Sequence, residues 1–474
     1  MIETERMTTP AYSFVDVKPD APPSMYSTLR LLAVCSPRLA LNTAWAAQWA
    51  ALGPLLQVLL SPSSVQLVQL VGPISGLLLA PTVGVWSDNC TSKFGRRRPF
   101  LCLGALLSCL CWLVMMFAVE IGEALGDTPA HLFDRSVEPS RAWTARVVVF
   151  TYVWMDVALN LTQTPLTLLI ADCAGDRLVT ASAIGSAYSI AGSFLVSGYI
   201  LAFGPAHESV KPFLCVLIAA MATTIGLVMF AANETPRIDT HSTTSTSKAA
   251  FAAVWDGVRR LPRVLSVYCV VLVFVQYGFF AYNGAKGQFF GLVVKNGSAF
   301  GADTCGHDSN PPCSAGQTAF NDGVALAGGA TDTMYNVVSL VYLGALPALV
   351  RRCGVQRVLI ASLLPQSLLI VLSISKVIVL DVAIVVGCSF TQNTLLALYL
   401  PTICHVIGVD EDIGVYAGAI NSAMCAGQFF SFVLASVLVT SSMGYGLPIL
   451  VGGVMSLLGF VIAAMFFRIQ LFAS

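Results

Sequence analysis

Charge is scarce in this sequence, because only 11% of its 474 residues are Asp, Glu, Lys or Arg. A soluble domain carries about 25% charged residues, so most of this chain is not adapted to water. Lys and Arg together number 25, and Asp and Glu also number 25. A nucleic-acid binder would have a basic excess, and a disordered chain would be poor in apolar residues. We therefore expect neither class, and no nucleic-acid partner.

Catalytic and metal-binding motifs are also missing. The sequence has no phosphate-binding loop, no His-Glu-x-x-His and no nucleophile elbow. Its 14 cysteines include no Cys-x-x-Cys pair, so a zinc site is not expected. The five histidines fall in tails, loops or at a helix end, which argues against proton transfer through a histidine deep in a membrane. We expect no enzyme activity, no cofactor and no metal.

Long apolar runs are what the sequence does contain, and its mean hydropathy is +0.78. The runs are continuous rather than alternating, which indicates membrane helices and not a spanning barrel. Twelve spans of about 20–25 residues would use about 270 residues. We expect them near 30–56, 65–87, 99–120, 146–170, 181–204, 212–232, 264–292, 323–349, 358–376, 379–404, 414–440 and 446–467.

The order of these runs is six, a polar linker, and six again. This pattern predicts an all-α integral membrane protein of the major facilitator fold, with 12 transmembrane helices in two six-helix bundles. The predicted parts are a cytosolic tail (1–28), an N-terminal bundle (29–232), a cytosolic linker (233–262), a C-terminal bundle (263–468) and a short cytosolic tail (469–474).

Orientation follows from the distribution of Lys and Arg. With the N-terminus inside, 17 of them lie in cytosolic segments and 6 on the opposite side. Because positive residues are retained in the cytosol, both termini are expected there. The first 28 residues have no apolar core, so we expect no cleavable signal peptide. The loop holding Cys305 and Cys313 then faces outward, which favours a local disulfide over two free thiols.

Three groups of charged residues stand out. Asp156 lies about ten residues into the fourth span, where a carboxylate costs about 2.5–3.5 kcal/mol and is a functional candidate. Lys286 and Asp332 fall in the seventh and eighth spans and could form a buried ion pair, or could both extend to the outer surface. The loop "SDNCTSKFGRRRPF" at 87–100 predicts a gating motif made of Asp88, Gly95, Arg96, Arg97 and Arg98, which could hold the two halves together. A plain positive-inside anchor is the alternative.

Four segments resemble a known family. They are "VGPISGLLLAPTVGVWSDNCTSKFGRRRPF" at 71–100, "NTAWAAQW" at 42–49, "WMDVALNLTQTP" at 154–165 and "AGAINSAMCAGQ" at 417–428. They are similar to motifs of the plant sucrose–proton symporters and the animal solute carrier 45 family. These form part of the glycoside–pentoside–hexuronide:cation symporter branch of the major facilitator superfamily.

The resemblance implies a proton-coupled sugar symporter for sucrose-like disaccharides or hexoses, working by alternating access. It implies that Asp156 is the proton-coupling carboxylate. It also places six residues around the sugar, namely Trp45, Gln48, Asn160, Gln163, Asn421 and Gln428. The seventh-span segment "NGAKGQ" at 283–288 has a Lys where the family has an acidic motif.

Two alternatives stay open at this stage. One is a carrier of the same fold for another small solute, such as an amino acid or a pterin. The other is a non-transporting membrane sensor. The expected partners are a small sugar, a proton and the lipid bilayer. A monomer in the plasma membrane is expected, although an acidic organelle is also compatible with the charge count.

Overall fold

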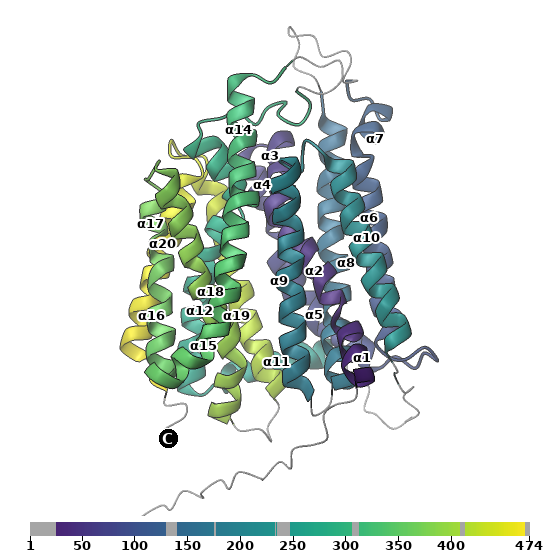
Figure 1. The fold of residues 1–474 in the computed structure, drawn as a ribbon, viewed down its shortest axis with the longest axis vertical. Coiled ribbons are helices and arrows are strands. Elements are labelled where there is room, and N and C mark those ends of the chain that lie inside the picture. Colours follow the sequence, from purple (N-terminus) through teal and green to yellow (C-terminus); the bar gives the residue numbers. More distant parts are fainter. Residues whose placement is uncertain are drawn as a thin grey trace, which may run out of the picture.

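The computed structural model describes residues 25–128, 140–174, 177–232, 234, 247–305, 312–407 and 413–469. All regular elements among them are helical. Figure 1 shows them as a bundle of long, roughly parallel helices, with the N-terminal helices on one side and the C-terminal helices on the other.

The N-terminal half begins with a divided segment made of α1 (Met25–Cys35), α2 (Pro37–Ala47), η1 (Gln48–Leu52) and α3 (Gly53–Leu59). Here η denotes a π-helix, a wider turn than the α-helix. The half continues with α4 (Pro62–Gln69), α5 (Val71–Asp88), α6 (Arg98–Met116), α7 (Ala118–Ala124), α8 (Ala142–Ala174), α9 (Leu178–Phe203) and α10 (Val210–Ala231).

The C-terminal half follows the linker helix α11 (Ser247–Arg259). Its first part contains α12 (Arg263–Asn283), α13 (Lys286–Gln288), η4 (Phe289–Val294), α14 (Ala315–Ala325), η5 (Leu326–Thr331) and α15 (Asp332–Cys353). Its second part contains α16 (Val355–Ser367), α17 (Leu369–Leu372), α18 (Ile378–Ile407), α19 (Ile413–Leu438) and α20 (Gly446–Phe466).

Eleven helices of the described chain are long and apolar enough to cross a membrane, so the protein is an integral multi-pass membrane protein. The first predicted span, 30–56, is not among the eleven, and its helix is divided. Pro37 lacks a backbone N–H and separates α1 from α2, and the π-turns of η1 separate α2 from α3. The other eleven predicted spans each overlap one of these helices.

Each half has its own main apolar core, and a small fourth cluster packs Val58 against Ala299, Ala302, Phe320 and Val324 of the other half. The largest cluster of buried apolar side chains is drawn from residues 31–232, and two further clusters are drawn from 265–469. Helices within each half approach closely at small residues. A Cβ on Gly192 would lie 2.4 Å from the carbonyl oxygen of Leu39, and one on Gly278 would lie 2.4 Å from that of Gly452. Such close packing is typical of membrane helices.

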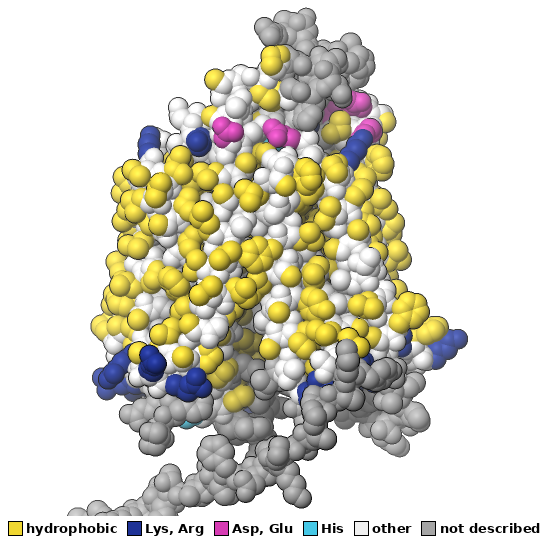
Figure 2. Space-filling model, viewed as in Figure 1, with side chains coloured by type: hydrophobic (Ala, Val, Ile, Leu, Met, Phe, Trp, Pro, Cys, Tyr) yellow, Lys and Arg dark blue, Asp and Glu magenta, His cyan; other side chains and the backbone are white. Residues whose placement is uncertain are grey.

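Lys and Arg gather at one end of the molecule. Figure 2 shows a wide apolar band with the larger patches of Lys and Arg along its lower edge, and a few more beside Asp and Glu along its upper edge. Arg351 and Arg352, at the end of α15, are both exposed. By the positive-inside rule, this end faces the cytosol. The linker helix α11 lies at the same end and packs against both α5 and α19, so it contacts both halves.

Candidate functional site

A cavity of about 250 Å³ lies between the two halves. Asn42, Trp45 and Trp49 contribute to its wall from the N-terminal half. Asn283, Lys286, Asp332, Tyr335 and Asn336 contribute from the C-terminal half. Amide groups beside indole and phenol rings suit a ligand that has hydroxyl groups and apolar faces.

Lys286 and Asp332 form an ion pair in the wall of this cavity. Nζ of Lys286 donates to Oδ2 of Asp332 at 2.5 Å. Both residues stand at interruptions in their helices: α12 ends at Asn283 just before Lys286, and η5 ends at Thr331 just before Asp332. Irregular backbone at membrane depth is tolerated where it is buried in protein or lines a cavity. The two interruptions therefore position the ion pair at the cavity.

Asp156 is fully buried and lies beside the cavity rather than in its wall. Nε2 of Gln48 donates to Oδ2 of Asp156 at 3.0 Å and to the hydroxyl oxygen of Tyr152 at 2.9 Å. Oδ1 of Asp156 has no hydrogen-bond partner among the described residues. A Cβ on Gly72 would lie 3.6 Å from this oxygen and 3.6 Å from Nε2 of Gln428, so the two halves approach each other at Gly72, close to Asp156.

The other residues predicted around a sugar are divided between these two places. Trp45 lines the cavity, and its indole N–H donates to Oε1 of Gln163 at 2.8 Å. Asn160 lies on the Asp156 side and donates to the hydroxyl of Ser75 at 3.1 Å. Asn421 is exposed, and its amide contacts Cys425 one turn along α19. The structure therefore brings Gln48 and Asn160 into contact with Asp156, and places Gln428 against the neighbouring Gly72.

Sequence reasoning missed Asn283, Tyr335 and Asn336 as cavity residues. Asn283 and Tyr335 lie within three residues of Lys286 and Asp332, and Asn336 lies one turn beyond Asp332. Asn42 also lines the cavity, and it donates to Ser193 at 2.7 Å. The available signal was a cluster of amides beside two intramembrane charges.

The gating motif at the cytosolic end is held within the N-terminal half. Arg97 pairs with Asp88 at 2.5 Å, and Arg96 pairs with Asp172 at 2.8 Å. The backbone N–H groups of Arg97 and Arg98 donate to the carboxylate of Glu234. Gly95 makes the turn with φ of +104°, a conformation that suits glycine. These contacts join α5, α6, α8 and Glu234, which follows α10. That the motif also holds the two halves together in one state stays a prediction.

The outer end carries polar contacts that do join the halves. Arg141 donates twice to Asp303, at 3.0 and 2.7 Å. Nε2 of His207 donates to Oδ1 of Asn321 at 2.8 Å, and the amide of Asn321 donates to Glu208 at 2.5 Å. We call these five residues the outer latch. His207 is 3% exposed, and burial lowers the pKa of its imidazole.

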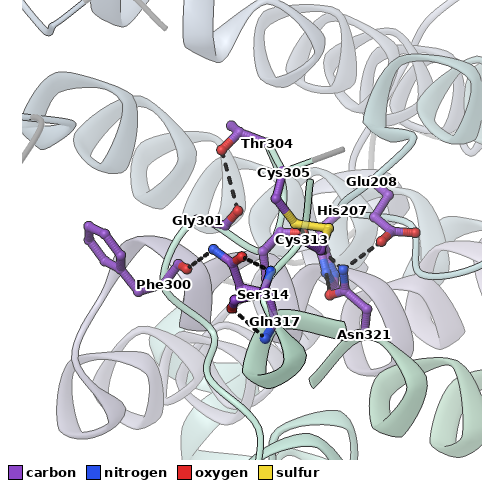
Figure 3. Close-up of a disulfide and its surroundings, with 11 residues drawn as sticks. His207, Glu208, Phe300, Gly301, Thr304, Cys305, Cys313, Ser314, Gln317 and Asn321 are labelled. Atoms are coloured by element: carbon purple, nitrogen blue, oxygen red, sulfur yellow. Dashed lines mark hydrogen bonds between the residues drawn. A yellow bond between two sulfur atoms is a disulfide. The ribbon is translucent and has the colours of Figure 1, made fainter. Parts of the chain in front are cut away.

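A disulfide joins Cys305 to Cys313, and Asp303 lies two residues before Cys305. Figure 3 shows the disulfide beside His207, Glu208 and Asn321. The amide of Asn321 also donates to the carbonyl of Ala302, next to Asp303, at 3.0 Å. The disulfide therefore restrains a segment that supplies two of the acceptors at the outer end.

Comparison with known proteins was made by sequence and by structure. Residues 57–304, just over half of the chain, match the family described as "MFS/sugar transport protein". The sucrose transport protein SUT5 of Oryza sativa is 30% identical over 279 residues, which cover 52% of this chain and 51% of the relative. The sucrose transport protein SUC3 of Arabidopsis thaliana is 34% identical over 171 residues, covering 36% and 28%. The matched regions thus span about half or less of these relatives' length.

Solved structures show the same fold at low identity. A D-xylose-proton symporter superimposes with a TM-score of 0.62 at 15% identity, covering 93% of this chain and 98% of that one. The nucleoside transporter NupG superimposes with a TM-score of 0.60 at 11% identity, covering 94% and 100%. These likenesses establish the major facilitator fold that the six-linker-six pattern predicted.

Proposed function

This chain belongs to the MFS/sugar transport protein family, and from that premise we propose that it is a proton-coupled sugar symporter working by alternating access. The proposed solute is a sucrose-like disaccharide or a hexose. The observation that carries the proposal is the position of Asp156, a buried carboxyl close to the place where the two halves meet beside a cavity lined by amides and indoles.

Asp156 is suited to take up and release the coupling proton. One of its oxygens accepts from Gln48, the other is unpartnered, and the ion pairs of the described chain do not include it. A neighbouring cation would hold a carboxyl group in its charged form. A buried carboxyl group without such a cation is free to bind and release a proton, and its charge changes each time. Because Asp156 and Gln428 of the other half both lie against Gly72, a change in that charge is expected to affect how the two halves pack there.

The cavity is suited to hold the sugar. Trp45 and Trp49 offer apolar faces, while Asn42, Asn283 and Asn336 offer both donors and acceptors for hydroxyl groups. In this structure the outer latch holds the two halves together at the outer end. We therefore infer that the structure is the state closed to the outside, and that transport requires the outer latch to open.

Uptake of labelled sucrose and glucose tests the proposal. The protein is expressed in a host lacking its own carriers, and its presence at the surface is verified. With the outside about two pH units more acidic, each proton supplies about 2.7 kcal/mol, enough for about 100-fold accumulation. Saturable uptake that rises at low outside pH and collapses with a protonophore is expected.

A carrier of the same fold for another small solute would give a different result. If neither sugar is taken up by protein at the surface, the sugar proposal is wrong. Labelled amino acids are then the next solutes to test, because a zwitterionic solute would have to separate Lys286 from Asp332 in order to pair with both. Proton coupling is judged separately, from the effect of the protonophore on whichever solute is transported.

A further inference from the structure

The cavity carries two charged groups, and they are not equally accessible. Among the described residues of its wall, Lys286 and Asp332 are the ones with charged side chains. The side chain of Lys286 is 7% exposed, while that of Asp332 is 19% exposed. Of the two side chains, that of Asp332 is therefore the more accessible to a ligand.

The greater exposure of Asp332 affects which ligands the cavity accepts. The ammonium of Lys286 is already satisfied by Oδ2 of Asp332 at 2.5 Å. A carboxylated ligand would meet the negative charge of Asp332 and would lose its hydration without gaining a free cation. A hydroxyl group, in contrast, donates to the carboxylate while the ion pair stays intact.

The pair also resists being opened by an uncharged ligand. Separating two buried opposite charges is costly, because each would be left without a partner. Asn283 and Asn336 stand beside the pair in the cavity wall and supply neutral donors and acceptors for the remaining hydroxyl groups. The wall near the pair is therefore complementary to a neutral polyhydroxy compound.

We propose that Asp332, by pairing with Lys286, is a specificity-determining residue that excludes carboxylated sugars and admits neutral ones. This inference rests on the proposed sugar transport. It assigns Asp332 the role of presenting an acceptor to the hydroxyl groups and Lys286 the role of holding that acceptor in place.

Competition between a neutral sugar and its acid tests the proposal. Uptake of the labelled neutral sugar is measured in the presence of unlabelled glucuronate, for the wild type, Asp332→Asn and the control Asp322→Asn. Asp322 is an exposed carboxylate on the neighbouring α14. In Asp332→Asn, glucuronate is expected to inhibit about tenfold more strongly than in the wild type, the factor for a hydrogen bond to a charged group. The control is expected to match the wild type.

A charge exchange guards against a variant that does not fold. Lys286→Asp with Asp332→Lys keeps a neutral pair but presents the ammonium to the cavity. Glucuronate is then expected to inhibit, as in Asp332→Asn. If the pair merely holds α13 against α15, the exchange restores the wild-type selectivity and the proposal is wrong.

The two proposals fail in different ways. If the wild type takes up no sugar, the proposed function is wrong. If the wild type takes up the neutral sugar, and glucuronate inhibits the wild type and both variants equally, sugar transport stands and the assignment of Asp332 is overturned.

Discussion

The amide nitrogen of Gln48 hydrogen-bonds both Oδ2 of Asp156 and the hydroxyl of Tyr152, at 3.0 and 2.9 Å. Gln48 is the first residue of η1, where the first membrane segment widens into a π-helix. Such turns are frequent at functional sites. Gln48 therefore connects the backbone interruption of one helix to the buried carboxyl of another, and any rearrangement of η1 changes the partner of Asp156.

Replacing Asp156 is expected to uncouple transport from the proton. Asp156→Asn keeps the size of the side chain and its contact with Gln48, but it cannot gain or lose a charge. Accumulation driven by about two pH units should fall from about 100-fold to equilibration, while exchange of labelled for unlabelled sugar remains. The measurement is the ratio of inside to outside sugar at steady state. Accumulation that survives in Asp156→Asn would show that another group couples the proton.

Breaking the ion pair of the outer latch is expected to favour opening to the outside. Arg141 and Asp303 have side chains that are 16% and 8% exposed, so removing one leaves a poorly solvated charge. Such a loss costs about 3–5 kcal/mol. Because about 1.4 kcal/mol changes an equilibrium constant tenfold, the equilibrium between the closed and open states should shift by more than tenfold. Asp303→Asn should therefore raise the labelling of a cysteine placed in the cavity, Asn336→Cys, by a membrane-impermeant thiol reagent from outside.

Charge exchange provides the control for this prediction. Arg141→Asp combined with Asp303→Arg should return labelling toward the starting level, because the ion pair is restored with its signs reversed. The parent with native cysteines alone gives the background. Unchanged labelling in Asp303→Asn would mean that the pair does not hold the outer end closed.

Removing the disulfide is expected to destabilise the outer end. Cys305 and Cys313 are eight residues apart, and closing so short a loop contributes about 2.6 kcal/mol in the chain-entropy model. Cys305→Ser with Cys313→Ser should lower the melting temperature of the purified protein. A reductant should lower that of the wild type similarly but leave the double variant unchanged. Cys102→Ser, which removes an exposed free thiol, is the matched control.

The arrangement of spans was predictable because it depends on the length and continuity of apolar runs. The eleven long helices follow the hydropathy of the sequence, and the bias of Lys and Arg gives their orientation. The ion pair between Lys286 and Asp332 could also be predicted, because opposite charges in two adjacent membrane spans are expected to pair. Its role in transport stays a prediction.

Local departures from regular helix could not be predicted in this way. The π-turns η1 and η5 do not change the apolar pattern, yet they direct Gln48 and Asp332 toward their partners. Long-range partners were equally hidden. Arg97 bonds to Glu234, which is 137 residues away, so nothing near the loop at 87–100 indicated this contact.

Acid is expected to weaken the outer latch through His207. Its imidazole is buried, donates to Asn321 and faces Glu208 and Asp303 from neighbouring segments. Because burial lowers the pKa of His207 in the folded protein, the unfolded chain binds a proton more readily. The contribution of the neutral imidazole is therefore complete above the ordinary pKa of about 6.5 and is lost as the pH falls below it.

The melting temperature of the purified protein, followed from about pH 7.5 to about pH 5, measures this contribution. His207→Gln keeps a donor toward Asn321 but cannot titrate in that range, so its melting temperature should fall less steeply with acid. Labelling of Asn336→Cys from outside should rise at low pH, and His207→Gln should reduce that rise. Low pH in the outside solution would then favour opening of the outer end, so the site would open under the same condition that supplies protons to it. Equal pH profiles in the wild type and His207→Gln would exclude His207 as the sensor.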